Sequence, residues 1–266
     1  MFAKFYLKSL LTNKSLWGWG VGFMLFWLFM GAYIFTTNSA SHQVHFYNAA
    51  VWYALIALIS ASTIATSISY SIYYSNSSLA YSFRFTRLKP LSYIGNALMS
   101  TSIMGAILGA LMLIFTYLLF SNQAGYPLVP ALPAYAIVVS VGAGAFMFLL
   151  AAVLITLVNN YMGLKNVTFV ALIPLLLTYV FGFSQLGLKM PAYIVYGSPF
   201  TEISDLLFQA YYGHPSTLVL SDPTSPLLNY HYQIAGLAAW IVILFFAATA
   251  LIKKIKPKPI EEARQV

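Results

Sequence analysis

The sequence predicts an all-α membrane protein with six transmembrane helices. Of its 266 residues, 61% are hydrophobic and only 7% are charged, which leaves too little polar surface to cover a water-soluble globule of this length. Apolar runs of about 20 residues, the length that crosses a bilayer, recur along the chain. No composition shift marks a second domain, so we treat 1–266 as one transmembrane domain.

Six apolar stretches are long enough to cross the hydrocarbon core. None of them contains Asp, Glu, Lys or Arg, as expected for segments that face lipid. The predicted spans are 16–36, 49–75, 91–120, 131–158, 166–186 and 231–252.

The basic residues predict the orientation of these spans. All but one of the 13 lysines and arginines fall before span one, between spans two and three, between spans four and five, or after span six. Because positive flanks stay in the cytoplasm, both termini should be cytoplasmic, the tail 253–266 included, in a multi-pass protein of the plasma membrane. A nucleic-acid partner is excluded, because such a binder gathers its basic residues on one solvated face.

The first 15 residues form a predicted interfacial helix. Phe2, Phe5, Tyr6 and Leu10 share one helical face while the lysines lie elsewhere, the pattern of a helix that rests on a membrane surface. The alternative is a basic leader that only sets topology.

The cytoplasmic connection 76–90 combines charge with aromatic residues. Arg84, Arg87 and Lys89 lie beside Phe83 and Phe85. We expect a short helix here, capped by Ser77 or Ser78 and ended by Pro90. One interpretation is a topology signal that meets anionic headgroups. The other is a surface for a protein partner, which would explain the aromatic side chains.

The external connection 187–230 contains its own helix signal. Ser198 can serve as N-cap, Pro199 as the first helical residue and Gly213 as the stop. One apolar stripe runs along this helix, formed by Phe200, Ile203, Leu206, Leu207, Ala210 and Tyr211. A helix of this length, about 21 Å, is too short to cross the bilayer, and it fits a re-entrant element and a surface helix equally well.

Two sets of small or hydroxylated residues repeat at helical spacing. The hydroxyls of span two lie along one face and could line a translocation path: Ser60, Thr63, Ser67, Ser71 and Ser75. The alternative is that they let helices approach and hydrogen-bond. In span three, Ala97, Thr101, Gly105 and Gly109 predict close helix packing.

Catalytic patterns are missing from the sequence. The chain has no cysteine and no G-x-x-x-x-G-K-[ST] phosphate loop. His42 and His45 have no third ligand nearby in sequence, which argues against a metal site. We expect a protein that is not an enzyme and binds no cofactor of its own.

This layout resembles that of the ABC-2 type transporter permeases. Members combine a basic N-terminal helix, six spans, a coupling helix after span two and short external helices before span six. The segments LKPLSYIGNALMS, at 88–100, and GSPFTEISDLL, at 197–207, are similar to the motifs at these places. One departure is that Asn76-Ser77-Ser78 stands where the coupling helix often begins with Glu and Gly.

The resemblance implies the partners of the chain. A separate cytoplasmic ATPase, which would bind ATP and magnesium, should contact the coupling segment through Leu79, Phe83, Arg84, Phe85, Arg87 and Leu88. A second permease subunit, identical or similar, should complete the transporter in the lipid membrane.

The expected function is therefore ATP-driven export of a hydrophobic or amphipathic cargo, such as a lipid, drug, peptide or glycan. One alternative is a secondary transporter, which usually needs an ionisable residue inside the membrane; the six spans have no Asp, Glu, Lys or Arg. The other is a structural anchor for a cytoplasmic complex, which would need no polar path.

Overall fold

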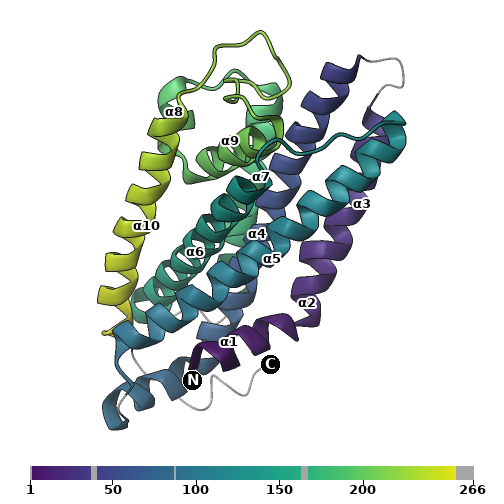
Figure 1. The fold of residues 1–266 in the computed structure, drawn as a ribbon. Coiled ribbons are helices and arrows are strands. Elements are labelled where there is room, and N and C mark those ends of the chain that lie inside the picture. The colour runs from purple at the N-terminus through teal and green to yellow at the C-terminus, as the bar shows by residue number, and fades with distance from the viewer. Residues whose placement is uncertain (1, 37–40, 87, 163–166, 256–266) are drawn as a thin grey trace.

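Six long apolar helices form the body of the protein in the computed structural model, which describes residues 2–36, 41–86, 88–162 and 167–255. Figure 1 shows them side by side in one bundle, with α9 among them near the upper end and α8 at the upper edge beside α10. Their length and composition confirm a multi-pass, all-helical membrane protein over the described part of the chain. The bounds of the spans are Lys14–Phe35, His42–Phe85, Pro90–Ala124, Pro133–Met162, Thr168–Gly187 and Tyr230–Ile252.

The first span is built from four segments. These are α2 (Lys14–Trp17), η1 (Gly18–Gly22), α3 (Phe23–Met30) and η2 (Gly31–Phe35). The two η segments are π-helical turns that begin at a glycine. At Gly31 a β-carbon would lie 2.5 Å from the ring of Trp52, so the absence of a side chain lets spans one and two approach closely.

The N-terminal segment forms α1 (Phe2–Leu11). It packs against α5 (Pro90–Ala124), where the ring of Tyr6 meets Tyr93 edge-on and Ser100 donates a hydrogen bond to the carbonyl of Ala3. Leu10 is buried, whereas Phe5 is 65% exposed.

The second span is the longest helix, α4 (His42–Phe85). Its 44 residues rise by about 65 Å, roughly twice the thickness of the hydrocarbon core. The expectation that Ser77 or Ser78 caps a separate helix is wrong, because the same helix continues through both residues. Burial of Leu79 and Ala80 favours this continuation, since their side chains pack only if the helix proceeds.

The connection between α4 and α5 also differs from expectation. The helix ends at Phe85, before Pro90. Lys89 adopts the extended conformation imposed on a residue that precedes proline, and Pro90 begins α5 at a position where its missing N–H costs nothing. Pro90 therefore starts a helix instead of ending one.

α5 and α6 (Pro133–Leu157) confirm the prediction of close packing in span three. A β-carbon at Gly105 would lie 2.9 Å from the Cα of Gly144, and one at Gly144 would lie 3.0 Å from the Cα of Gly105. The two backbones therefore touch at these glycines, as small residues allow in membrane helices. α6 continues into a π-helical turn, η3 (Val158–Met162).

The segment before span six contains the predicted helix. After α7 (Thr168–Gly187) come α8 (Ala192–Gly197), α9 (Pro199–Tyr212) and α10 (Tyr230–Ile252). Pro199 begins α9, and Gly213 ends it with φ +85°, a conformation that favours glycine. Both features confirm the sequence signals.

α9 is packed deeply among the other helices of the bundle. It contacts α4, α6, α7 and α10, and its residues are buried except Gln209 and Tyr212, which are partly exposed. Trp240 donates a hydrogen bond from Nε1 to the carbonyl of Gly197. This places the α8–α9 turn ten residues, or about 15 Å, along α10.

Candidate functional site

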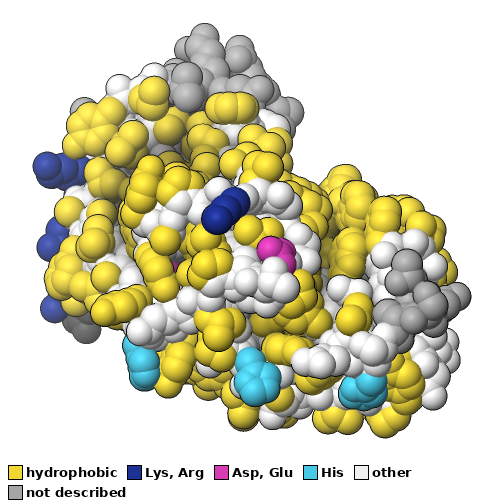
Figure 2. All heavy atoms as spheres, turned by 90° about the horizontal axis from the view of Figure 1, so that it is seen from above, with side chains coloured by type: hydrophobic (Ala, Val, Ile, Leu, Met, Phe, Trp, Pro, Cys, Tyr) yellow, Lys and Arg dark blue, Asp and Glu magenta, His cyan; other side chains and the backbone are white. Residues whose placement is uncertain are grey.

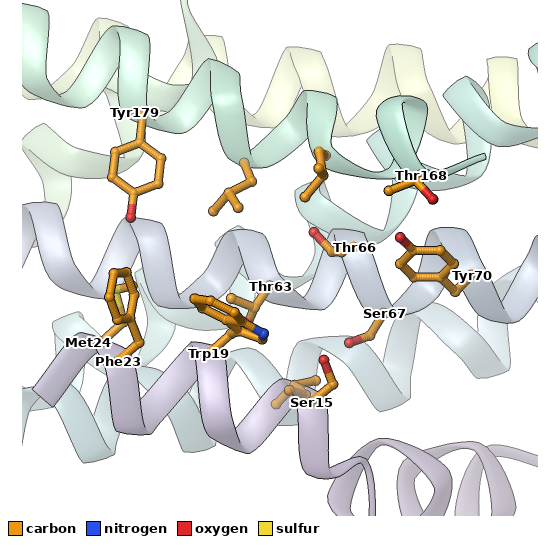
Figure 3. Close-up of a pocket in the computed structure, with 13 residues that line it drawn as sticks. Ser15, Trp19, Phe23, Met24, Thr63, Thr66, Ser67, Tyr70, Thr168 and Tyr179 are labelled. Atoms are coloured by element: carbon orange, nitrogen blue, oxygen red, sulfur yellow. The ribbon is translucent and has the colours of Figure 1, made fainter. Parts of the chain in front are cut away.

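A cavity of about 390 Å³ lies between the first span, α4 and α7. It is lined by Ser15, Leu16, Trp19, Phe23, Met24, Thr63, Thr66, Ser67, Tyr70, Thr168, Leu172, Leu175 and Tyr179. Figure 3 shows these side chains projecting from the three elements toward a common space. A cavity of this size falls in the lower part of the range that holds small ligands.

The two ends of the cavity differ in chemistry. Hydroxyl groups from Ser15, Ser67, Tyr70 and Thr168 gather at one end, whereas Phe23, Met24 and Tyr179 lie toward the other (Figure 3). No residue of the lining carries a charge. This arrangement suits an uncharged or amphipathic molecule better than an ion.

The hydroxyl at the centre of the cavity wall belongs to Thr66. Its Oγ1 is buried and has no hydrogen-bond partner among the described residues. A buried polar atom normally has a partner, so this atom can accept or donate a hydrogen bond to an occupant.

The five hydroxyl residues predicted to share one face of span two differ in their surroundings. Ser75 donates a hydrogen bond to the carbonyl of Ser71 within α4. Thr63 and Ser67 line the cavity. Ser60 instead donates a hydrogen bond to the carbonyl of Gly20 in η1 at 2.6 Å, which is the helix-packing role weighed for this face. Ser71 lies beside α1, where it interacts with Tyr6.

The residues expected to contact an ATPase differ in exposure. Leu79 is buried, and Phe83 packs edge-on against Tyr93 of α5. Arg84 and Phe85 are exposed, the latter by 78% and stacked on exposed Tyr81. Leu88 is partly buried, and Arg87 lies outside the described residues.

A second polar cluster lies inside the bundle around α9. Asp205 accepts a hydrogen bond from the side-chain amide of Gln185 in α7 at 2.6 Å and another from Gln233 in α10 at 2.7 Å. Ser204 donates to the Gln185 carbonyl oxygen at 3.1 Å. All four side chains are at most 1% exposed. The network joins α7, α9 and α10.

Glu202 lies one helical turn before Asp205 but receives no hydrogen bonds of this kind from the part of the chain that the structure describes. Its side chain is 0% exposed, and neither carboxyl oxygen has a hydrogen-bond partner among the described residues. Gly236 of α10 faces it so closely that a β-carbon there would overlap Oε1.

Burial raises the pKa of both carboxyl groups. For Glu202 it raises the pKa to about 8, because the charged form loses its hydration. For Asp205, burial raises the pKa well above its usual range, Ser216 and Gln185 oppose the shift, and the nearby Glu202 adds to it. Two like charges this close cannot both be stable without water, so the pair retains a proton at neutral pH.

This cluster is not evident from the sequence alone, because α9 is amphipathic and its polar face is free to meet water in the absence of other information. The structure covers that face with α7 and α10. The available signal was a glutamine in each neighbouring span, Gln185 and Gln233, since buried amides require partners.

The end of the molecule that carries the 187–230 segment has few charges. Figure 2 shows this face as mostly hydrophobic or uncharged, with small isolated patches of charged and histidine side chains. Among the described residues, no group of three or more His, Cys, Asp or Glu side chains is placed to hold a metal ion.

Comparisons with protein-family models, curated proteins and solved structures find no match for this chain.

Proposed function

We propose that the chain is the membrane permease subunit of an ATP-driven exporter, similar to the ABC-2 type permeases. The observation that carries this proposal is the cavity between the first span, α4 and α7. A structural anchor needs no such space inside its helices. A permease needs one, and its hydroxyl-lined and aromatic parts suit an amphipathic cargo.

The orientation in the plasma membrane follows from the charges. The described basic residues apart from Lys189 lie on α1, at the start of α2, near the α4–α5 connection and just after α10. These elements meet at the lower end of the bundle in Figure 1. We assign this end to the cytoplasm, so α9 enters the bundle from outside as a re-entrant helix.

The partner ATPase binds at the end of α4 in this proposal. Tyr81 and Phe85 form an exposed aromatic stack with Arg84 beside them, a combination typical of energetically important contacts. Leu79 and Phe83 support this surface from within the chain instead of entering the partner. ATP and magnesium belong to the partner, and Arg87 remains an expected contact.

A second permease subunit and lipid cover the apolar flanks. In the membrane-crossing windows of α10 and the first span, only 17% and 28% of residues are buried inside the chain. Lipid can cover all of this surface, and an identical or similar subunit covers part of it in the assembled exporter.

Purification tests the proposal directly. The chain should be isolated from its native membrane in mild detergent, and its companions identified by mass spectrometry. We expect a soluble subunit with a nucleotide-binding phosphate loop in comparable amount. Recovery of the chain without such a subunit, together with transport in lipid vesicles that needs no ATP, would contradict the proposal.

A secondary transporter is the second candidate, and Glu202 is the observation that favours it. The six spans contain no Asp or Glu, but the structure places this carboxyl inside the bundle on α9. Proteoliposomes distinguish the two candidates. Transport driven by a pH gradient without ATP would support the secondary carrier, whereas transport that requires ATP and a partner would support the exporter.

A further inference from the structure

The carboxyl group of Glu202 is buried in a place that disfavours its charged form. Its side chain is 0% exposed, and both oxygens are without a partner among the described residues. Neighbours of an ionised carboxylate normally include N–H or O–H donors or a cation, because an isolated buried charge is very costly. A neutral carboxylic acid can be buried with fewer hydrogen-bond donors and without a cation.

The described residues of the surrounding helices place no lysine or arginine near Glu202. The elements packed against α9 are α4, α6, α7, α8 and α10. Their described lysines and arginines consist of Arg84 alone, at the far end of α4. Their other ionisable residues are histidines and tyrosines; the ones near the same end of the bundle are His42, His45, Tyr47, Tyr53, Tyr135, Tyr179, Tyr193, Tyr196, Tyr230, His231 and Tyr232.

The second carboxyl group, that of Asp205, receives the donors that Glu202 lacks. Two glutamine amides donate to its oxygens, which favours its ionised form. The environments of the two groups therefore differ, and such a difference separates their protonation. Glu202, the carboxyl without donors among the described residues, is therefore the one whose neutral form the packing requires.

Because Glu202 contacts Gly236, its protonation state affects how α9 packs against α10. The carboxyl lies directly against a glycine of α10, and no side chain intervenes. When Glu202 loses its proton to water, the new charge must regain hydration. Separation of α9 from α10 would let water reach it.

We propose that Glu202 binds a proton inside the helical bundle and that this proton keeps α9 packed against α10. The ligand is the proton itself. Two glutamine-bound oxygens at Asp205 and an unsupported carboxyl at Glu202 form the site. This inference does not depend on the identity of the cargo or of the energy source, because it concerns the isolated chain.

Infrared spectroscopy of the full chain in nanodiscs of neutral lipid tests the protonation. At pH 6 the wild type should show a C=O stretch of a protonated carboxylic acid that shifts in D₂O and disappears as the pH rises through about 8. Glu202→Gln should lose the part of this band that titrates near pH 8, whereas Asp222→Asn, which changes a partly exposed carboxyl of a surface loop, should retain it. If the wild type shows no such band, the proposal is wrong, even if the variant fails to fold.

The pH dependence of stability gives an independent test. The folded-state pKa of Glu202 is raised above its ordinary value of 4.5 to about 8. Its contribution is therefore fully present below about pH 4.5 and is lost as the pH rises toward 8. The thermal midpoint of the wild type should fall over this window more steeply than that of Glu202→Gln. Equal slopes in the two proteins would contradict the proposal.

Labelling tests the movement of α9. A cysteine at buried Ala210 should react faster at pH 9 than at pH 7, relative to a cysteine at exposed Thr224. The same ratio should stay constant in the Glu202→Gln background. All measurements should be unchanged when choline replaces sodium; protection by sodium at high pH that requires Glu202 would show a cation site and overturn the proton assignment.

Discussion

The carboxyl group of Glu202 on α9 lies directly against the backbone of Gly236 on α10. A methyl group at position 236 would overlap the Glu202 oxygen, so Gly236→Ala should push the carboxyl away or separate the helices. Overpacking of this kind costs about 1–3 kcal/mol. We expect a lower thermal midpoint of the purified chain in detergent.

Gly142→Ala is the matched control for this substitution. Position 142 is also a helical glycine, but a β-carbon there would lie 3.7 Å from Leu237, an ordinary contact. This variant should be as stable as the wild type. Equal losses in the two variants would mean that an added methyl group on these spans in general, and not the Glu202 contact, is responsible.

Removal of Asp205 should destabilise the protein strongly. Asp205→Ala would leave the side-chain amides of Gln185 and Gln233 without their acceptor. Each unsatisfied buried donor costs about 1–3 kcal/mol, so we expect a loss of about 2 kcal/mol or more in the free energy of unfolding. Asp222→Ala removes a carboxyl that bonds Thr224 within its own loop and should cost much less. A silent Asp205→Ala variant would show that this network does not hold α9 in place.

The six spans and α9 could be predicted because their signals are local. An apolar run sets the length of each span, and Pro199 and Gly213 set the ends of α9 through backbone conformations that depend on one residue each. The continuity of α4 could not be predicted in this way. Serine at positions 77 and 78 suits a helix cap, but tertiary packing of Leu79 and Ala80 overrides that local preference.

The candidate site, too, could be predicted only where it depends on local spacing along one helix. Spacing along α4 placed Thr63 and Ser67 on one face, and both line the cavity. Spacing could not reveal that Ser60, on the same face, would meet Gly20, because that depends on how a neighbouring span approaches. Likewise, Glu202 becomes unusual only when α10 covers it.

The cavity wall should tolerate an apolar substitution structurally but not functionally. Ser67→Leu places a larger apolar side chain among the hydroxyls at the polar end of the cavity. We expect impaired export or altered cargo preference with normal assembly, measured as ATP-dependent transport in vesicles and as co-purification of subunits. Ser71→Leu, outside the cavity lining, is the control. If Ser67→Leu instead prevents subunit association, this face serves helix packing.

Accessibility to membrane-impermeant thiol reagents tests the orientation. The natural chain has no cysteine, so single cysteines can be placed at Ser78 and Thr224, both exposed at opposite ends of the bundle. In intact cells only Thr224→Cys should be labelled, and after permeabilisation both should be. Labelling of Ser78→Cys in intact cells would overturn the assignment of the basic end to the cytoplasm.

The central claim, that a separate ATPase drives this permease through the end of α4, is tested most directly by Tyr81→Ala combined with Phe85→Ala. Both side chains are exposed, so their removal should leave folding and topology intact. Loss of two aromatic anchors should weaken subunit binding by about 2 kcal/mol or more. We predict that the double variant reaches the membrane but loses the co-purifying ATPase and ATP-dependent transport in vesicles. Retention of both partner and transport would contradict the account.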